Sequence, residues 1–183
     1  GLLDQTQYTQ PVLFALQCSL FRLWESWGIH PHAVMGHSLG ELAAAWAAGV
    51  FDLEQGLGLV AERARLMQTM PHHGTMIAVL GAEERVREIL PQFGTAVEIA
   101  ALNGPDHLVL SGDETILRRA SDQLESAGLT CRPLSVSHGF HSSHMDGMLG
   151  DLEKVVAGIG LSDPTLLMIS NLTGRPINPG EMN

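Results

Sequence analysis

The chain has few cysteines, few basic residues and no long hydrophobic run. Its two cysteines among 183 residues, Cys18 and Cys131, are too few for a disulfide framework, and reduced thiols favour a cytoplasmic protein. Ten Lys and Arg against 20 Asp and Glu give a net charge of -10, which argues against a nucleic-acid partner because neutralising phosphates requires a basic surface. No apolar run reaches the length of a membrane span, and no segment has the pattern of a signal peptide.

The chain is instead rich in apolar residues. Hydrophobic residues make up 45% of the sequence and charged residues only 16%. A chain of this length and composition can bury a sizeable core, so we predict one globular protein with room for a subdomain.

The most informative stretch is the Gly-x-Ser-x-Gly turn at 36–40. A short apolar strand precedes it, and residues 41–49 form an alanine-rich helix. The two glycines lack a Cβ where strand and helix crowd together, so Ser38 can adopt a strained backbone that presents its Oγ to a cleft. The amide of Leu39 then points to where an oxyanion would develop. We predict Ser38 as a nucleophile; the alternative is a tight turn capped by a serine.

Three histidines follow in the segment 137–145. A serine hydroxyl needs a general base, and histidine is the usual one near neutral pH. His141 is our candidate, whereas His144 fits a surface position better. The three-residue spacing of His138, His141 and His144 also permits a metal site. Since no carboxylate or cysteine cluster accompanies them at ligand spacing, we expect no metal.

Two helices flank the turn. Apolar residues at three- and four-residue spacing predict a helix over 8–27, in which Gln10 on its own would be a surface amide. A second helix is predicted over 53–70. Arg63 lies beside the inner stripe of this helix, where a buried guanidinium requires an anion; the alternative is an ordinary surface ion pair with Glu62. The stripe of the first helix comprises Val12, Leu13, Leu16, Leu20, Leu23, Trp24 and Trp27, and that of the second comprises Leu57, Val60, Ala64, Leu66 and Met67.

In the middle of the chain, short predicted strands alternate with helices. The predicted strands are 76–80, 96–102, 107–110 and 130–136, and the predicted helices are 82–90 and 114–127. The order β-α-β-β-α-β is that of a ferredoxin-like subdomain. We expect this subdomain at 75–135, inserted in an α/β subdomain formed by 1–74 and 136–183. In the last part, a helix at 147–158 precedes an apolar strand at 166–169 that fits a parallel sheet beside the strand before Ser38.

From the residues alone, two enzyme classes share this pattern. An α/β-hydrolase such as an esterase or thioesterase commonly has Gly-His-Ser-Leu-Gly, but it requires an acid between serine and histidine in the sequence. An acyltransferase can operate with Ser and His when a backbone carbonyl orients the base.

Six motifs in order resemble the signatures of malonyl-CoA:acyl-carrier-protein transacylases, and most of all the acyltransferase domains of polyketide synthases. They are Gln10-Pro11, Gly36–Glu41, Arg63–Gln68, Ala101–Pro105 with Ser111-Gly112, His138–Ser142 and Ser170–Gly174. The resemblance spans essentially the whole chain. It implies a hydrolase-like parallel sheet with a nucleophile elbow and an inserted ferredoxin-like βαββαβ subdomain.

The resemblance also implies a role for each site residue. Ser38 would take the acyl group from a CoA thioester, and His141 would act as base and then as acid. The main-chain carbonyl of Asn171 would orient His141. Arg63 would clamp the free carboxylate of a malonyl unit, because a guanidinium fork binds a carboxylate bidentately. The other predicted pocket residues are Gln10, His37 and Phe140, with Leu39 as the oxyanion donor.

Substrate and partners follow from the same resemblance. The segment His138–His141 resembles the His-Ala-Phe-His form that accompanies malonyl rather than methylmalonyl units, with glycine in place of the usual alanine, and Leu39 after the serine agrees with it. The expected acceptor is the phosphopantetheine thiol of an acyl carrier protein, and other polyketide synthase domains are expected partners. No bound cofactor, nucleic acid or membrane is expected.

The chain departs from the family pattern at both ends. The family begins with a strand and a Gly-Gln-Gly loop that supplies a second oxyanion donor, and nothing similar precedes Gly1; its last strands and helices have no counterpart after Asn183. We therefore expect a fragment of the domain. Two alternatives stay open. A serine hydrolase with an editing role would discharge its acyl group to water as fast as to a thiol, and a non-catalytic docking module would never acylate Ser38.

Overall fold

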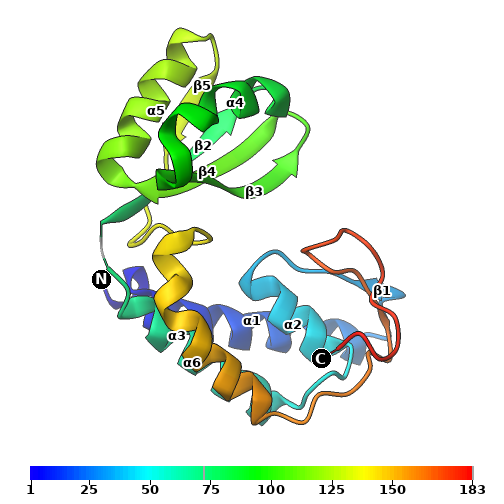
Figure 1. The fold of residues 1–183 in the computed structure, drawn as a ribbon. Helices are drawn as coiled ribbons and strands as arrows, with labels where there is room; N and C mark the ends of the chain where they lie inside the picture. Colours follow the sequence, from blue (N-terminus) through cyan, green and yellow to red (C-terminus); the bar gives the residue numbers. More distant parts are fainter. Residues whose placement is uncertain (72, 183) are drawn as a thin grey trace. The chain divides into compact units, whose positions relative to one another are not determined.

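The structure is a computed structural model that describes residues 1–71 and 73–182 (Figure 1). It has the α/β fold expected from the sequence, with a parallel sheet and an antiparallel one. The chain forms two compact units, each described by itself below. Unit 1 comprises Gly1–Gln68 and Gly150–Asn183, and unit 2 comprises Thr69–Leu149. None of the helices described has the length and apolar character needed to cross a membrane.

Unit 1 consists of helices and a two-stranded parallel sheet. Strands β1 and β6 pair in parallel, with Ala33 opposite Leu167 and Val34 opposite Met168. Helix α6 begins in unit 2 and ends in unit 1. The elements are η1 (Leu2–Asp4), α1 (Thr6–Ser26), β1 (Ala33–Val34), α2 (Leu39–Ala47), α3 (Leu53–Gln68), α6 (Asp146–Ala157) and β6 (Leu167–Met168).

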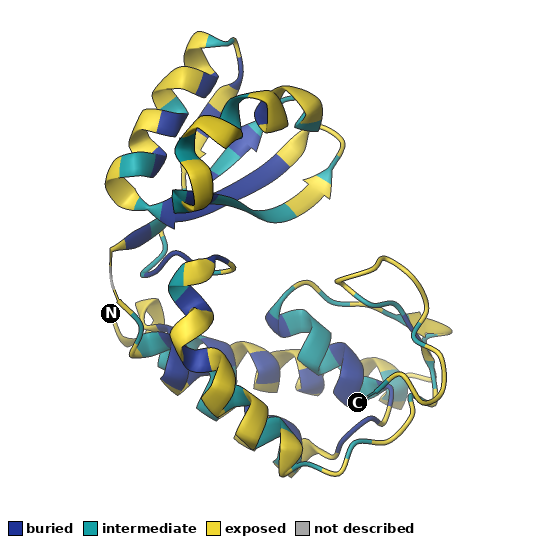
Figure 2. Ribbon diagram, viewed as in Figure 1, coloured by how far each residue is buried: buried dark blue, intermediate teal, exposed yellow. Residues whose placement is uncertain are grey.

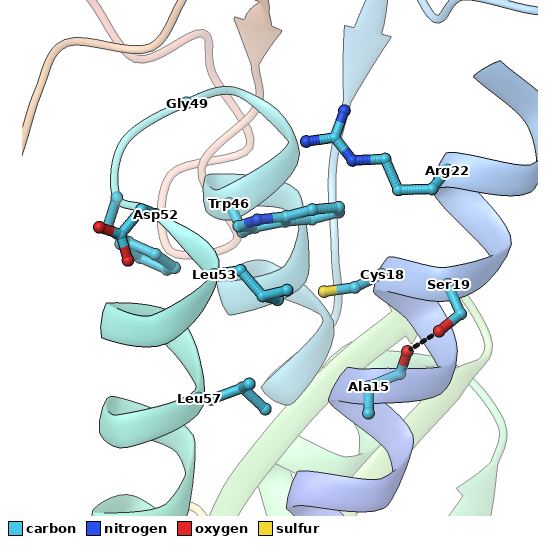
Figure 3. Close-up of a pocket in the computed structure, with 10 residues that line it drawn as sticks. Ala15, Cys18, Ser19, Arg22, Trp46, Gly49, Asp52, Leu53 and Leu57 are labelled. Atoms are coloured by element: carbon cyan, nitrogen blue, oxygen red, sulfur yellow. Dashed lines mark hydrogen bonds between the residues drawn. The ribbon is translucent and has the colours of Figure 1, made fainter. Parts of the chain in front are cut away.

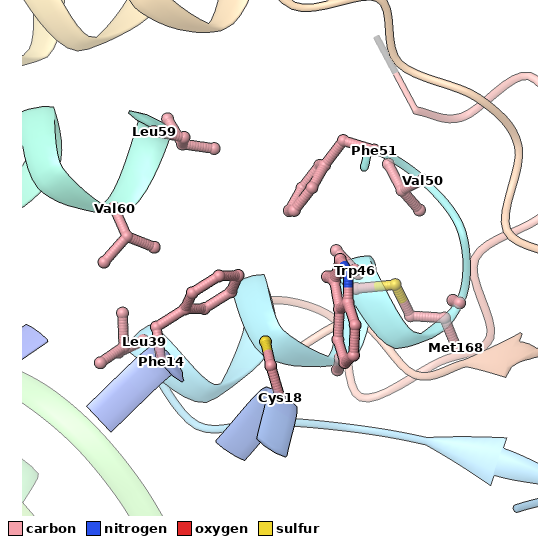
Figure 4. Close-up of a cluster of buried hydrophobic side chains, with 12 residues drawn as sticks. Phe14, Cys18, Leu39, Trp46, Val50, Phe51, Leu59, Val60 and Met168 are labelled. Atoms are coloured by element: carbon pink, nitrogen blue, oxygen red, sulfur yellow. The ribbon is translucent and has the colours of Figure 1, made fainter. Parts of the chain in front are cut away.

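The core of unit 1 lies where α1, α2 and α3 meet. Phe14 of α1 is fully buried, and it packs with Leu39 of α2 and Val60 of α3 (Figure 4). Gly56 leaves room for two rings, since a Cβ there would lie 2.8 Å from ring atoms of both Phe14 and Phe51 and would force them to shift. The absence of a side chain at this position therefore favours the packing of α3 against Phe14 of α1.

Helix α1 buries a different face from the one its apolar residues mark. Its buried residues are Thr6, Gln10, Phe14 and Cys18. The apolar stripe that identifies the helix in the sequence is exposed, and it comprises Val12, Leu13, Leu16, Leu20, Leu23, Trp24 and Trp27. Leu57 of α3, predicted on the inner side of the helix, is 37% exposed and lines an open hollow together with residues of α1 and α2. The other four residues of that stripe are buried.

Unit 2 is a four-stranded antiparallel sheet with two helices. The strands lie side by side in the order β3-β4-β2-β5. Along the chain, the elements follow the order β-α-β-β-α-β that was predicted for a ferredoxin-like subdomain. The elements are β2 (Gly74–Leu80), α4 (Glu83–Ile89), η2 (Leu90–Ala96), β3 (Val97–Gly104), β4 (His107–Asp113), α5 (Glu114–Ser126), β5 (Thr130–Pro133) and η3 (Ser143–Met145).

The core of unit 2 forms between α5 and the sheet. Asp113 caps α5 by accepting a hydrogen bond from the amide of Ile116 at 3.0 Å. Leu117, Ala120 and Leu124 then recur along one face of the helix and are fully buried. They pack with strand residues such as Leu110.

The boundaries of the compact units differ from the predicted subdomain boundaries. The structure counts residues 136–149 with unit 2, whereas the sequence placed them with the α/β subdomain. The reason is local packing, since a Cβ on Gly74 of β2 would lie 2.6 Å from the backbone nitrogen of Gly139. The division into 1–74 with 136–183 and 75–135 stays a prediction about domain organisation.

Candidate active site

Ser38 lies at the sharp turn between β1 and α2. Its φ of 52° and ψ of -113° are strained for a residue with a side chain, and α2 begins at the next residue. A Cβ on Gly36 would lie 2.0 Å from the carbonyl carbon and oxygen of Gly40, so no other residue fits this close approach. The strand–turn–helix geometry expected around Ser38 is therefore present.

Of the first three amides of α2, two are hydrogen-bonded to carbonyls of the preceding turn. Those of Gly40 and Glu41 donate to the carbonyls of His37 and Ser38, at 2.9 and 3.0 Å. The amide of Leu39, the first residue of the helix, has no acceptor within the helix. It is the amide that the sequence predicts as the oxyanion donor.

Backbone strain distinguishes the two predicted catalytic residues. Within residues 1–71 and 73–182, Ser38 and His141 are the only non-glycine residues with a positive φ, 52° and 57°. Such conformations cost of order 1–3 kcal/mol each and cluster at functional sites. The observation supports a functional role for both positions.

Arg63 of α3 reaches both Gln10 and Ser38. Its Nη2 donates to the Ser38 Oγ at 3.1 Å, and its Nη1 donates to the Oε1 of Gln10. Gln10 is buried, with 7% of its surface exposed, so it is not the surface amide that its position alone would suggest. Unit 1 thus brings together the predicted nucleophile, the predicted carboxylate clamp and Gln10.

The charge of Arg63 has no acidic partner among the residues described. Glu62, the partner considered in the sequence, instead pairs with Arg65 at 2.9 Å. Burial lowers the pKa of Arg63 from its ordinary value. A guanidinium nevertheless stays protonated in proteins, so a half-buried positive charge lies beside Ser38.

Asn171 follows β6 and is connected to the helix that carries the turn. Its backbone amide donates to the Oε1 of Glu41 at 2.8 Å. This hydrogen bond joins residues 130 positions apart and fixes the segment whose carbonyl is predicted to orient His141.

In unit 2, the segment 137–143 is packed tightly against the sheet. A Cβ on Gly139 would lie 3.1 Å from the Cα of Gly74 and 3.2 Å from the Ser111 Oγ, so the loop runs close over β2 and β4. The Ser142 hydroxyl donates to the Gly139 carbonyl at 2.7 Å, and the Ser143 amide donates to Glu98 Oε1 at 2.9 Å.

The side chains of this loop divide into buried and exposed ones. His138 is fully buried, its ring centroid lies 5.6 Å from that of Phe140, and its Nδ1 lies 2.8 Å from the Ser137 Oγ. His141 is exposed. Because His141 and Phe140 belong to unit 2 and Ser38 to unit 1, the pairing of Ser38 with His141 and of His141 with Asn171 stays a prediction.

Two hollows in unit 1 lie outside the cluster of Ser38, Arg63 and Gln10. One, of about 560 Å³, is lined by the exposed His37 together with residues of β1, α1 and α2. The other, of about 630 Å³, lies between α1, α2 and α3 (Figure 3). Within it, Cys18 points toward Leu53, and the guanidinium of Arg22 lies 5.1 Å from the ring centroid of Trp46.

Sequence reasoning did not identify three residues that contact the predicted site residues. They are Thr6 and Met67, which contact Gln10, and Glu41, which binds Asn171. The i, i+4 spacing of Thr6 with Gln10 and of Arg63 with Met67 is the signal that could have found the first two. As for a metal, no cluster of three or more His, Cys, Asp or Glu in the part of the chain that the structure describes could hold one.

The family model for the acyl transferase domain matches residues 1–183. A mycoketide-CoA synthase of Mycobacterium tuberculosis is 49% identical over 175 residues, which cover 96% of this chain and 4% of the synthase. The chain therefore spans a small part of that relative.

Solved structures agree with the family match. The acyltransferase domain from the second module of the salinomycin polyketide synthase has a TM-score of 0.94 and 43% identity, covering 98% of this chain and 43% of that one. A malonyl CoA-acyl carrier protein transacylase from Burkholderia pseudomallei has a TM-score of 0.89 and 35% identity, covering 97% of this chain and 62% of that one. The chain belongs to the acyl transferase domain family, whose members include both of these enzyme types.

Proposed function

We propose that this chain carries the acyl-loading site of a polyketide synthase type acyltransferase, which moves a malonyl group from malonyl-CoA to the phosphopantetheine thiol of an acyl carrier protein. The main observation in support of this proposal is the position of Arg63. The half-buried guanidinium of Arg63 lies 3.1 Å from the Ser38 hydroxyl and has no acidic partner among the residues described. A nucleophile next to an unneutralised cation suits a substrate that has both a reactive carbonyl and a free carboxylate.

The reaction would proceed in two half-steps. The Ser38 oxygen adds to the thioester carbonyl while its proton passes to His141, and the resulting oxyanion accepts a hydrogen bond from the Leu39 amide. The carbon–sulfur bond then breaks, and the departing CoA thiolate takes the proton from His141. In the second half, the carrier thiol gives its proton to His141 and its sulfur attacks the seryl ester carbonyl. The ester carbon–oxygen bond then breaks, and the Ser38 oxygen takes the proton from His141.

Arg63 explains why the acyl group would be malonyl rather than acetyl. A guanidinium binds a carboxylate with two parallel charge-assisted hydrogen bonds, which acetyl cannot form. The substrate carboxylate would replace the Ser38 hydroxyl as the acceptor for Nη2. Because malonyl is short, binding at Arg63 also places its thioester carbonyl near Ser38. The carboxylate grip therefore selects the substrate and positions it.

The relatives support the finer parts of the proposal. One solved relative is named a malonyl CoA-acyl carrier protein transacylase, and the other is an acyltransferase domain of a polyketide synthase. The segment His138–His141 and Leu39 favour malonyl over methylmalonyl. Discrimination by a single methyl group is modest in general, so we expect preference rather than exclusion.

The test is intact-protein mass spectrometry after brief incubation with malonyl-CoA, methylmalonyl-CoA or acetyl-CoA. We expect a malonyl adduct on the wild type and none on Ser38→Ala. Arg63→Ala should lower malonyl labelling by about a hundredfold, because it removes one partner of a buried charge pair, and should leave acetyl labelling nearly unchanged. Arg65→Ala, two residues away and paired with Glu62, is the matched control.

Three results would contradict the proposal in different ways. No adduct with any donor would favour a docking module over an enzyme. An adduct that water removes as fast as a pantetheine thiol would favour a hydrolase. Equal loss of malonyl and acetyl labelling in Arg63→Ala would mean that Arg63 does not bind the carboxylate.

A further inference from the structure

Two pairs of residues face each other where α1 meets α3. Thr6 and Gln10 lie four residues apart on α1, and Arg63 and Met67 lie four residues apart on α3. Thr6, Gln10 and Met67 are each less than 8% exposed. Buried polar side chains are costly unless they are hydrogen-bonded, so their contacts determine how they are oriented.

The contacts of Gln10 leave one orientation for its side-chain amide. Arg63 can only donate hydrogen bonds, so the amide must present its Oε1 to the guanidinium. The amide nitrogen then faces the other way, where it donates to the Thr6 Oγ1 at 2.7 Å and to the Met67 Sδ at 3.1 Å. Since a thioether can only accept a hydrogen bond, the contact with Met67 also requires the amide nitrogen, and not the oxygen, on the side away from Arg63.

We propose that Thr6 and Met67 are positioning residues, which hold the Gln10 amide so that its oxygen keeps the Arg63 guanidinium in place for the substrate carboxylate. The inference rests on the proposed function, because it assigns these residues to the selection of malonyl. Neither residue touches Ser38 in this arrangement; both act through Gln10 and Arg63.

The consequence is specific to dicarboxylic substrates. Without the Thr6 hydroxyl, one buried N–H of Gln10 loses its strong acceptor, and the amide gains by rotating toward other groups. The Gln10 oxygen then no longer accepts from Nη1, and the Arg63 guanidinium becomes more mobile. Binding of a carboxylate must then order the guanidinium, which weakens binding. Acetyl transfer does not use the guanidinium, so it should be spared.

The test compares kcat and KM of the wild type and variants with malonyl-CoA and with acetyl-CoA. The enzyme assayed is the full natural protein that contains these 183 residues. Thr6→Val keeps the shape of the side chain and removes the hydroxyl. We expect kcat/KM for malonyl-CoA to fall about fivefold, mainly through KM, as for one lost neutral hydrogen bond. The value for acetyl-CoA should change less than about twofold. Thr6→Ser should restore the wild-type preference.

The matched control is Thr9→Val on the same turn of α1. The Thr9 hydroxyl donates only to the carbonyls of Leu3 and Gln5, at 2.6 and 3.0 Å, so its loss should affect neither substrate. Met67→Leu removes the weaker acceptor and keeps the apolar volume. We expect it to act in the same direction as Thr6→Val, by about twofold.

The outcomes separate this inference from the function on which it rests. If Arg63→Ala does not lower malonyl labelling, the proposed function and the inference are both wrong. If Arg63→Ala does lower it but Thr6→Val behaves like Thr9→Val, or lowers both substrates equally, only the inference is wrong. In a Gln10→Leu background Thr6→Val should have no further effect, and additive losses would overturn the path through Gln10.

Discussion

In unit 2 the core lies between the helices and the four-stranded sheet, whereas in unit 1 one side of α1 is exposed to solvent (Figure 2). In unit 2, Val79, Leu110 and Leu117 are fully buried. Among the residues described, Leu102 and Leu149 are its only exposed large hydrophobic side chains, while unit 1 exposes the whole apolar stripe of α1.

The two sides of α1 differ in what they contact. The buried side holds Thr6 and Gln10 against Arg63, and Phe14 anchors it in the core of unit 1. The exposed stripe takes no part in forming that cluster. Unit 1 therefore brings Ser38, Gln10 and Arg63 together through a few side-chain hydrogen bonds, whereas in unit 2 the segment that carries His141 packs against β2 and β4.

The largest expected effect sharpens the functional side of this comparison. If unit 1 supplies the nucleophile and unit 2 the base, His141→Ala should leave Ser38 in place but without a proton acceptor. We expect the single-turnover rate of acylation by malonyl-CoA to fall by about 10²–10⁴-fold, the usual contribution of a general base. Quenched-flow mass spectrometry of the Ser38 adduct measures it.

The control for His141 is His144→Ala, three residues along the same segment and part of the 3₁₀ turn η3. It should change the rate by less than about threefold, as expected of a residue outside the proton path. An equal loss in both variants would mean that the segment, rather than His141, is what matters.

A second prediction tests the difference in packing. Leu117 is fully buried in unit 2 and Leu20 is 45% exposed on α1. Leu117→Ala should lower the free energy of unfolding by about 3 kcal/mol, because it removes packed methyl groups and leaves a cavity. Leu20→Ala should change it by less than about 0.5 kcal/mol. Urea denaturation followed by circular dichroism measures both, and equal losses would show that the stripe of α1 is covered in solution.

The sequence predicted the elements of this fold well because the local signals agree with one another. The strained turn at Ser38 lies between a strand and a helix as expected, and Asp113 caps the helix that ends before Gly128. The helix predicted over 8–27 is α1 at Thr6–Ser26. Short strands were the exception, since the strand predicted to reach 136 ends at Pro133.

The buried side of α1 and the contact of Gln10 with Arg63 could not be predicted from the same signals. Apolar spacing identifies a helix, but it does not say which side meets the rest of the chain. Thr6 and Gln10 are buried where α1 packs against α3, and there Gln10 accepts from Arg63, 53 residues later, and donates to Thr6. The contact with Arg63 appears only once the helices are packed, whereas the i, i+4 spacing already relates Gln10 to Thr6.

The smallest expected effect concerns the two cysteines, one in each unit. Burial raises the pKa of both the Cys18 and the Cys131 thiols, so both should react slowly at pH 7 and faster as rising pH forms more thiolate. Exposure alone, 4% for Cys18 and 9% for Cys131, predicts faster labelling of Cys131. We expect the opposite order by about tenfold, because Cys18 lines the open hollow of about 630 Å³ whereas Cys131 belongs to the closed core and requires local opening. Peptide mapping after N-ethylmaleimide treatment measures both rates, and faster labelling of Cys131 would mean that the two units do not differ in access.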